Sequence, residues 1–300
     1  MDDTPMPDAN PGPSPNAPLR DASESGPDPL ATFPARESRR PPDNLPLEIS
    51  SFVGREKELA EVKRLLEDNR LLTLTGSGGC GKTRLALAAA GELVGGFEDG
   101  AWLVELASLA DPSLVRGAVA SALGVREQPG SPLTESLSDY LRTKKMLLVL
   151  DNCEHLVEAC AVLAEALLRT CPNLRILATS REAFGIVGET RLAVPLLSLP
   201  DPRRLPAVED VAHYEAANLF VDRAKAVKPE FAVTERNAMY VAQICYRLDG
   251  IPLAIELAAA KVKVLSVEQI AARLDDRFAL LNDGGRTALA RQRTLEAAMD

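Results

Sequence analysis

Apolar residues along this 300-residue chain follow two different patterns. Between about residues 70 and 195, short and mainly apolar runs alternate with longer segments whose apolar residues recur at helical spacing. The short runs predict five strands, namely Leu71–Thr75, Ala101–Leu106, Met146–Leu150, Leu174–Thr179 and Arg191–Val194. Strands that alternate with helices predict a parallel five-stranded sheet flanked by helices, an α/β fold that binds ligands at the carboxyl ends of its strands.

Helices are expected before and between these strands. They cover about Leu59–Leu66, Lys82–Leu93, Asp111–Leu123 and Thr134–Arg142, and one more follows Asn152 with Leu156, Cys160, Leu163 and Leu167 on one stripe. Asp111 and Pro112 are typical of a helix start, because proline fits the first helical turn.

From Asp210 onward the pattern is helical only. It predicts helices at about Asp210–Val227, Thr234–Leu248, Pro252–Val264 and Ser266–Leu274. The chain therefore divides into four expected parts: a tail (1–45), a P-loop nucleotide-binding domain (46–205), a small helical domain (206–282) and the start of a further domain (283–300). The tail is rich in proline and poor in aliphatic residues, which predicts a disordered segment. A plain linker is the simplest interpretation of the tail, and a binding motif is the alternative.

The first strand is followed by a phosphate-binding loop. Gly76, Gly81, Lys82 and Thr83 satisfy the pattern G-x-x-x-x-G-K-[ST], between a predicted strand and a predicted helix as this motif requires. Its glycines let backbone N–H groups point at a polyphosphate, Lys82 reaches the β- and γ-phosphates, and the Thr83 hydroxyl takes one Mg²⁺ position. The residues expected to contact the nucleotide here are Gly76, Ser77, Gly78, Gly79, Cys80, Gly81, Lys82, Thr83 and Arg84.

Two further strand ends supply candidate chemistry. Asp151 ends an apolar strand, where a Walker B acid would reach the Mg²⁺ beside Thr83. The alternative is a helix start with Asn152 as its capping residue, and both roles are compatible. After the next strand, the Ser180 hydroxyl and the Arg181 guanidinium could touch the γ-phosphate. Lys82, Asp151 and Arg181 are therefore the catalytic candidates.

The composition of the chain limits which classes of partner are expected. The net charge of -9 and the absence of a basic run with interleaved aromatics argue against direct nucleic-acid contact by this segment. No secretory signal and no uninterrupted apolar stretch of membrane length occurs, so a soluble cytoplasmic protein is expected. Five cysteines without a C-x-x-C pair favour reduced thiols. Cys80 is either an activated thiolate in the loop or a small residue tolerated there.

Five motifs, in order, resemble the NB-ARC (AP-ATPase) class of STAND signalling ATPases, especially the ATPase core of bacterial regulators with LuxR-like or SARP-like DNA-binding domains. They are Phe52–Glu56, the phosphate loop, Leu148–His155, Ala178–Glu182 and Gly250–Ala254. The resemblance implies a helical ARC-like domain after the P-loop domain and a winged-helix-like domain that begins near Gly284. It also implies an ATP/ADP switch, with self-association or effector domains beyond residue 300.

The resemblance further assigns roles to single residues. Val53 and Arg55 would contact the adenine edge, Arg181 would sense the γ-phosphate, and Pro252 would pack on the adenine from the helical domain. Many relatives have a second acidic residue after the Walker B aspartate, where this chain has Asn152. An amide cannot take a proton from water, so at most slow ATP hydrolysis is expected.

Glu154 and His155 lie close by and could orient water, with a helix-start role as the alternative. The other function considered is a dedicated ATP-dependent enzyme, a phosphotransferase or a mechanical ATPase. Against it, the chain has no L-S-G-G-Q signature and no acidic pair after Leu150. It also has no N-K-x-D element, which favours adenine over guanine nucleotides.

Overall fold

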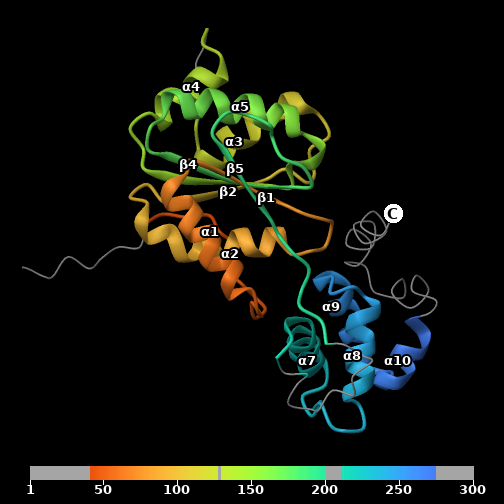
Figure 1. The fold of residues 1–300 in the computed structure, drawn as a ribbon. Helices are drawn as coiled ribbons and strands as arrows, with labels where there is room; N and C mark the ends of the chain where they lie inside the picture. Colours follow the sequence, from red (N-terminus) through yellow and green to blue (C-terminus); the bar gives the residue numbers. More distant parts are fainter. Residues whose placement is uncertain (1–40, 128–129, 201–210, 212, 275–300) are drawn as a thin grey trace, which may run out of the picture. The chain divides into compact units, whose positions relative to one another are not determined.

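A five-stranded, fully parallel sheet forms the centre of the first part of the protein (Figure 1). The computed structural model describes residues 41–127, 130–200, 211 and 213–274, all within one compact unit, Arg40–Asp300. The strand order is β2-β3-β4-β1-β5. The strands are β1 (Leu71–Thr75), β2 (Ala101–Glu105), β3 (Met146–Asp151), β4 (Leu174–Ser180) and β5 (Glu189–Ala193). The predicted α/β fold with five parallel strands is confirmed.

Some predictions fall outside the described residues. They concern the tail as far as residue 40, the domain boundary near residue 205 and the segment 283–300.

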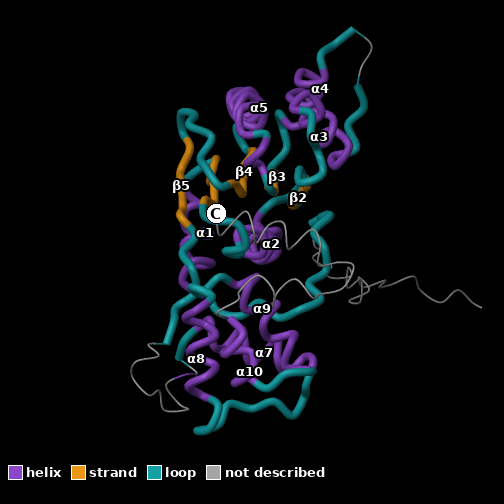
Figure 2. The backbone as a smooth tube through the Cα atoms, turned by 90° about the vertical axis from the view of Figure 1, so that its right-hand side faces the viewer, coloured by secondary structure: helices purple, strands orange, loops and turns teal. Residues whose placement is uncertain are grey.

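Helices cover both faces of the sheet, and the strand sequence explains why. They are α1 (Glu56–Asp68), α2 (Lys82–Leu93), α3 (Val115–Leu123), α4 (Leu133–Leu141) and α5 (Val157–Thr170). Within β1, Leu72 and Leu74 pack with α1 and α2, while Leu71 faces the core formed with α3, α4 and α5. Successive residues of a strand point to opposite faces, so a fully apolar strand supplies two cores. Figures 1 and 2 show α1 and α2 on one side of the sheet and α3, α4 and α5 on the other.

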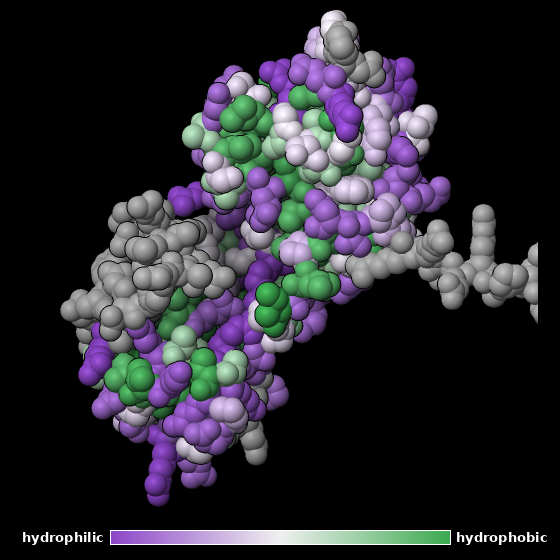
Figure 3. Space-filling model, turned by 180° about the vertical axis from the view of Figure 1, so that it is seen from behind, coloured by the Kyte–Doolittle hydropathy of each residue, from purple (hydrophilic) through white to green (hydrophobic). Residues whose placement is uncertain are grey.

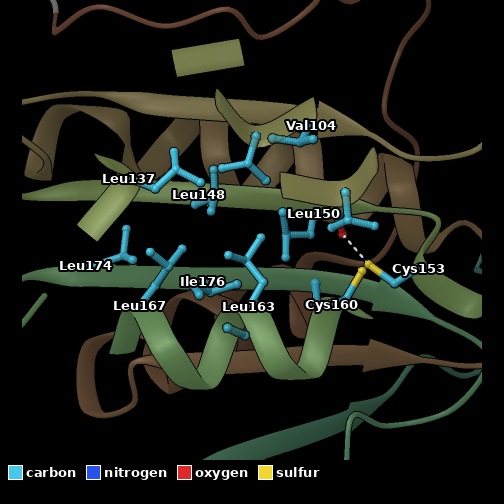
Figure 4. Packing of buried hydrophobic residues seen from close by; sticks show 14 of the residues in the cluster. Val104, Leu137, Leu148, Leu150, Cys153, Cys160, Leu163, Leu167, Leu174 and Ile176 are labelled. Carbon is cyan, nitrogen blue, oxygen red and sulfur yellow. Dashed lines mark hydrogen bonds between the residues drawn. The ribbon is translucent and has the colours of Figure 1, made fainter. Parts of the chain in front are cut away.

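Helix α5 shows how the second core is filled. Cys160, Leu163 and Leu167 recur at helical spacing and pack against β3 and β4, with Leu148 and Ile176 among their neighbours (Figure 4). All five side chains are at most 2% exposed. The predicted apolar stripe of this helix is therefore confirmed.

Short 3-10 turns precede two of the helices, η2 (Pro112–Leu114) before α3 and η3 (Cys153–His155) before α5, and η1 (Val94–Gly96) follows α2. Pro112 occupies the first turn of η2, as predicted, and the Asp111 carboxylate caps this start by accepting a hydrogen bond from the Ser113 N–H at 2.8 Å. The expected cap by Asn152 is wrong: its side chain makes no capping hydrogen bond. Asn152 instead has φ 64°, a left-handed conformation that asparagine tolerates, and it turns the chain sharply after β3.

The second part is helical, as predicted. It consists of α7 (Glu215–Val227), α8 (Ala238–Arg247), α9 (Pro252–Ala260), the 3-10 turn η4 (Lys261–Lys263) and α10 (Val267–Arg273). Pro252 occupies the first turn of α9, and Ser266 and Gln269 form a capping box at the start of α10. The helices share a core in which Phe220 and Ile255 are fully buried. Helix α8 begins later than predicted, because the Asn237 side chain accepts a hydrogen bond from the Thr234 N–H in a turn before it.

Hydrophobic and hydrophilic side chains are interspersed on the surface of the protein. Figure 3 shows hydrophobic areas separated by hydrophilic ones on the face that it presents. Leu47, Ile49 and Val187 are among the exposed large apolar side chains. The first two lie in the segment before α1, and Val187 lies in the loop before β5. None of the helices in the described ranges is long and apolar enough to cross a membrane.

Candidate nucleotide-binding site

The loop between β1 and α2 has the backbone that phosphate binding requires. Gly81 precedes α2 with φ 95°, and Gly79 has φ 72°, conformations that residues with a Cβ rarely adopt. A Cβ on Gly79 would also lie 3.1 Å from the Leu253 Cβ at the start of α9. Because α2 begins at Lys82, its N–H groups and positive dipole end lie where the loop ends.

Lys82 spans this loop. Its ammonium donates hydrogen bonds to the carbonyls of Gly76 at 2.9 Å and Ser77 at 3.0 Å, and the residue is only 8% exposed. Within the described part of the chain, this buried lysine contacts two neutral carbonyls and forms no ion pair, so its positive charge is not compensated there. An anion in the loop would therefore gain a strong charge-assisted hydrogen bond.

A hydroxyl–carboxylate chain lies directly beside the loop. The Thr83 hydroxyl donates to Asp151 Oδ1 at 2.7 Å, and the Thr179 hydroxyl donates to the same oxygen at 2.6 Å. The Asn152 N–H in turn donates to the Thr179 hydroxyl at 2.9 Å. Thr83, Asp151 and Thr179 come from α2, β3 and β4. The carboxyl ends of β3 and β4 lie side by side because the two strands are parallel, and α2 begins beside them. Hydroxyl and carboxylate oxygens are hard ligands, so Thr83 and Asp151 fit the Mg²⁺ of a bound nucleotide.

Above these groups lies a cavity of about 330 Å³, within the range of small-ligand sites. Its wall contains nine of the residues expected to bind nucleotide: Val53, Arg55, Gly78, Gly79, Gly81, Lys82, Thr83, Arg84 and Pro252. The wall thus joins the loop to the first turn of α9, and the structure brings these distant motifs together.

Five expected site residues do not line the cavity: Gly76, Ser77, Cys80, Asp151 and Arg181. Gly76 and Ser77 hold Lys82 through their carbonyls, and Asp151 supports Thr83 from behind. The Arg181 side chain is 42% exposed, and its Nε lies 3.7 Å from Glu154 Oε1. Its role as a γ-phosphate sensor stays a prediction.

Cys80 is fully buried, and so are the other cysteines, Cys153, Cys160, Cys171 and Cys245, all of them free thiols. Full burial favours the interpretation of Cys80 as a small residue over that of a reactive thiolate. Cys153 lies beside Cys160 (Figure 4), and its hydrogen bond with Cys160 and its burial raise the pKa of the Cys153 thiol well above its ordinary value. Burial likewise raises the pKa of Cys245 to about 12.

Arg55 connects the loop to the helical part. It is 4% exposed, and its Nη2 donates to the carbonyls of Cys80 at 2.8 Å and Pro195 at 2.7 Å. Its backbone N–H donates to Glu215 Oε1 at 2.9 Å, at the first residue of α7. Its Nη1 is buried without a hydrogen-bond partner among the residues the structure describes. A buried donor of this kind gains free energy from an acceptor on a ligand.

Glu215 is held by several donors at once. Besides Arg55, the Ser198 N–H donates to its Oε2 at 3.0 Å. Burial acts to raise the pKa of Glu215, but the hydrogen bonds from Ser198 and Arg55 outweigh it and hold the pKa below its ordinary value of 4.5. The charged form of Glu215 therefore stabilises the junction with α7.

A second junction is built on Glu256 of α9. Its Oε1 accepts from Arg84 Nη1 at 3.1 Å and from Arg223 Nε of α7 at 3.0 Å. Both arginines also donate to the Ser51 carbonyl, at 2.8 and 2.9 Å. We call the contacts of Arg55 with Glu215, and of Arg84 and Arg223 with Glu256, the polar seam. Because the Arg84 guanidinium is engaged in the polar seam, the predicted contact of Arg84 with nucleotide stays a prediction.

Several wall residues were not expected from the sequence. The apolar part of the wall includes Phe52, Leu197, Leu219 and Leu253. Phe52 and Leu253 lie within motifs already singled out, whereas Leu197 and Leu219 have no local signal. Thr179 lines the cavity where Ser180 was expected, because alternate residues of β4 face opposite sides. Ser180 is fully buried and accepts a hydrogen bond from the Glu182 N–H.

Comparison with known proteins finds a matching domain family and several relatives. Residues 64–193 match the family described as AAA domain, a stretch that runs from α1 to the end of β5. An uncharacterized protein of Mycobacterium tuberculosis is 44% identical over 251 residues, 84% of this chain and 61% of that protein. A putative HTH-type transcriptional regulator of the same organism is 47% identical over 241 residues, 80% of this chain and 25% of that protein. The chain thus spans about three fifths of one of these relatives and a quarter of the other.

One solved structure with a similar fold is a signal transduction ATPase with numerous domains (STAND) protein with a tetratricopeptide repeat sensor, from Pyrococcus horikoshii. The TM-score is 0.50 at 15% identity, and the match covers 80% of this chain and 34% of that one. At this identity the match supports the fold, which is that of a P-loop NTPase.

Proposed function

We propose that this chain is the ATP- and ADP-binding module of a cytoplasmic STAND-type switch of the NB-ARC kind, the regulatory core of a transcriptional regulator, with slow or conditional ATP hydrolysis. The observation that supports it best is the composition of the cavity wall. Loop residues such as Gly79 and Lys82 share this wall with Pro252 and Leu253 of α9. A single bound nucleotide would therefore contact both parts of the protein.

The contacts around the cavity suggest how a γ-phosphate would act. The Leu253 N–H donates to the Gly79 carbonyl at 3.3 Å, so α9 rests directly on the phosphate loop. Arg84, which follows Thr83, binds Glu256 on the same helix. Any shift of the loop on phosphate binding would reach α9 through these two contacts. To move a two-state switch from 1:99 to 99:1, ATP and ADP must differ by about 5.5 kcal/mol in their preference between the states.

The relatives support a regulatory role. The protein named as a putative HTH-type transcriptional regulator shares most of this chain's length with it but is much longer. We propose that the module serves the same kind of protein and acts on effector domains or on further copies of itself. The expected ligands are adenine nucleotide and Mg²⁺.

The test is to identify and then exchange the nucleotide. Freshly purified protein is denatured, and the released nucleotide is separated by chromatography, with ADP as the expected result. Hydrogen exchange at residues 251–256 is then compared in the presence of Mg²⁺ with ADP or with a non-hydrolysable ATP analogue. Different protection supports the switch, whereas equal protection contradicts it. Guanine nucleotide, or no binding at any concentration, contradicts the proposal, and rapid turnover on a small-molecule acceptor would favour a dedicated enzyme.

A further inference from the structure

Hydrolysis of ATP requires a group that accepts a proton from water, and the structure narrows the choice. Asp151 Oδ1 already accepts two hydroxyl hydrogen bonds, from Thr83 and Thr179, and Asp151 does not line the cavity. Asn152 does line it, but an amide oxygen is too weak a base. Neither Asp151 nor Asn152 is therefore suited to accept the proton from water.

Two acidic residues occur in the described wall of the cavity, Glu154 and Glu256. Glu256 is bound to two guanidinium groups, those of Arg84 and Arg223, in the polar seam. Glu154 differs, because its Oε2 is buried and has no hydrogen-bond partner among the described residues. A buried carboxylate oxygen without a donor is costly unless a ligand or water supplies one.

The backbone holds Glu154 in place. It lies in the 3-10 turn Cys153–His155, which the left-handed Asn152 directs away from β3. The Asn152 N–H is bonded to Thr179, and at the other end a His155 ring nitrogen bonds the Leu109 carbonyl at 2.7 Å. A turn anchored at both ends fixes the direction of the residue between them.

The side chain of Glu154 is also oriented. Its Oε1 lies 3.7 Å from Arg181 Nε, and its side chain is 21% exposed. This ion pair engages Oε1 alone. Oε2 accepts no hydrogen bond from the described residues and has almost no surface open to solvent, so a turn of the carboxylate is needed to present it to water in the cavity whose wall Glu154 lines. His155, the other group considered for this role, lines a different cavity, together with residues of α5 such as Val162.

We propose that Glu154 is the general base for ATP hydrolysis in this site, an inference that rests on the proposed function. A water molecule between Glu154 and the γ-phosphate gives a lone pair to phosphorus, and one of its protons passes to the Glu154 carboxylate. The bond between phosphorus and the β–γ bridging oxygen breaks, and its electron pair leaves with ADP. The products are ADP and inorganic phosphate, to which Glu154 returns the proton.

The test compares Glu154→Gln with wild type and with Glu182→Gln. Glu182 is an exposed residue that lies next to Arg181 in the sequence and does not line the cavity. Affinities for ATP and ADP are measured by calorimetry, and hydrolysis of bound ATP is followed in single-turnover reactions. We expect Glu154→Gln to bind both nucleotides as wild type does and to hydrolyse ATP at least about 100-fold more slowly. Glu182→Gln should match wild type in both measurements.

Each other outcome has a defined meaning. Hydrolysis by Glu154→Gln within about threefold of wild type overturns the role of Glu154 and leaves the proposed function intact. Loss of nucleotide binding in the variant also overturns it, since the residue then serves binding. A wild-type protein that binds ATP but never hydrolyses it overturns the inference alone, whereas one that binds no nucleotide overturns the proposed function as well.

A second variant covers the case in which Glu154→Gln does not fold. Glu154→Ala opens space for a small carboxylic acid, and formate should restore part of the lost hydrolysis rate if a carboxylate is required. A rate that is low and unaffected by formate, with wild-type nucleotide affinity, would count against a general base.

Discussion

The interior of the sheet region and the polar seam are built from different chemistry. Leu72 and Leu148 are fully buried in apolar cores on the two faces of the sheet. The seam consists of guanidinium–carboxylate and backbone contacts, and the side chains of Arg84 and Glu256 are 34% and 25% exposed. A buried leucine contributes several kcal/mol, whereas a partly exposed ion pair contributes about 0 to 1 kcal/mol.

This difference teaches which contacts a ligand can change. The difference in binding free energy contributed by one phosphate cannot open an apolar core, because exposing the core costs more free energy than a few hydrogen bonds to the phosphate supply. That difference is comparable in size to the free energy of the seam contacts, which lie next to the phosphate loop. Under the proposed function, the seam is therefore the part of the molecule whose arrangement a bound nucleotide would set.

The largest expected effect is in the core. Leu148→Ala should lower the free energy of unfolding by about 2–5 kcal/mol, because it leaves a cavity between β3 and α5. The measurement is urea unfolding of the nucleotide-free protein. Val162→Ala, at a position of α5 that is 62% exposed, is the control and should change stability by less than about 0.5 kcal/mol. Equal effects of the two substitutions would contradict the assignment of the core.

The second effect is on nucleotide affinity. Lys82→Ala should weaken binding of Mg²⁺–ATP by about 10- to 100-fold, since hydrogen bonds to charged groups contribute about 1.5–3 kcal/mol. Titration calorimetry measures the change. The matched control is Lys63→Ala on α1, which removes a surface ion pair with Glu92 of α2. Wild-type ADP affinity in Lys82→Ala would show that the site is wrongly assigned.

A smaller effect is expected in the seam itself. Glu256→Gln removes the charge shared by Arg84 and Arg223 and should lower stability by about 1 kcal/mol. Its distinctive result is a reduced difference between ADP and ATP-analogue states in hydrogen exchange at residues 251–256. The exposed Glu67→Gln on α1 serves as the control. An undiminished difference in Glu256→Gln would mean that the seam does not transmit the state of the nucleotide.

The smallest expected effect depends on pH. Because the pKa of folded Glu215 is held below its ordinary value of 4.5, its contribution to stability is present above that value and is lost as pH falls through the folded pKa. Glu215→Gln should therefore lower stability at pH 7 and reduce the loss of stability between pH 7 and acid. Denaturant unfolding at several pH values measures both changes. A parallel pH profile in the variant and wild type would contradict this role.

Much of the fold was predictable because its signals are local. The strand Leu71–Thr75 and the helix from Lys82 to Leu93 have the predicted bounds, since the glycines of the loop separate two clear apolar patterns. The helix start at Asn152 was not predictable in the same way. Its left-handed turn and the 3-10 segment that follows serve the geometry of the site, and the amphipathic pattern begins only beyond them.

The amino-acid sequence by itself determined the phosphate loop, the acid at the end of β3 and the order of strands and helices along the chain. These depend on residue types at short spacing, which local propensity and burial fix. Only the tertiary structure decided that Thr179 rather than Ser180 lines the cavity, that Arg84 binds Glu256, and that Glu154 has a buried oxygen without a hydrogen-bond partner among the described residues. Each of these facts depends on which side chains meet across segments far apart in the chain, and no local pattern encodes such a meeting.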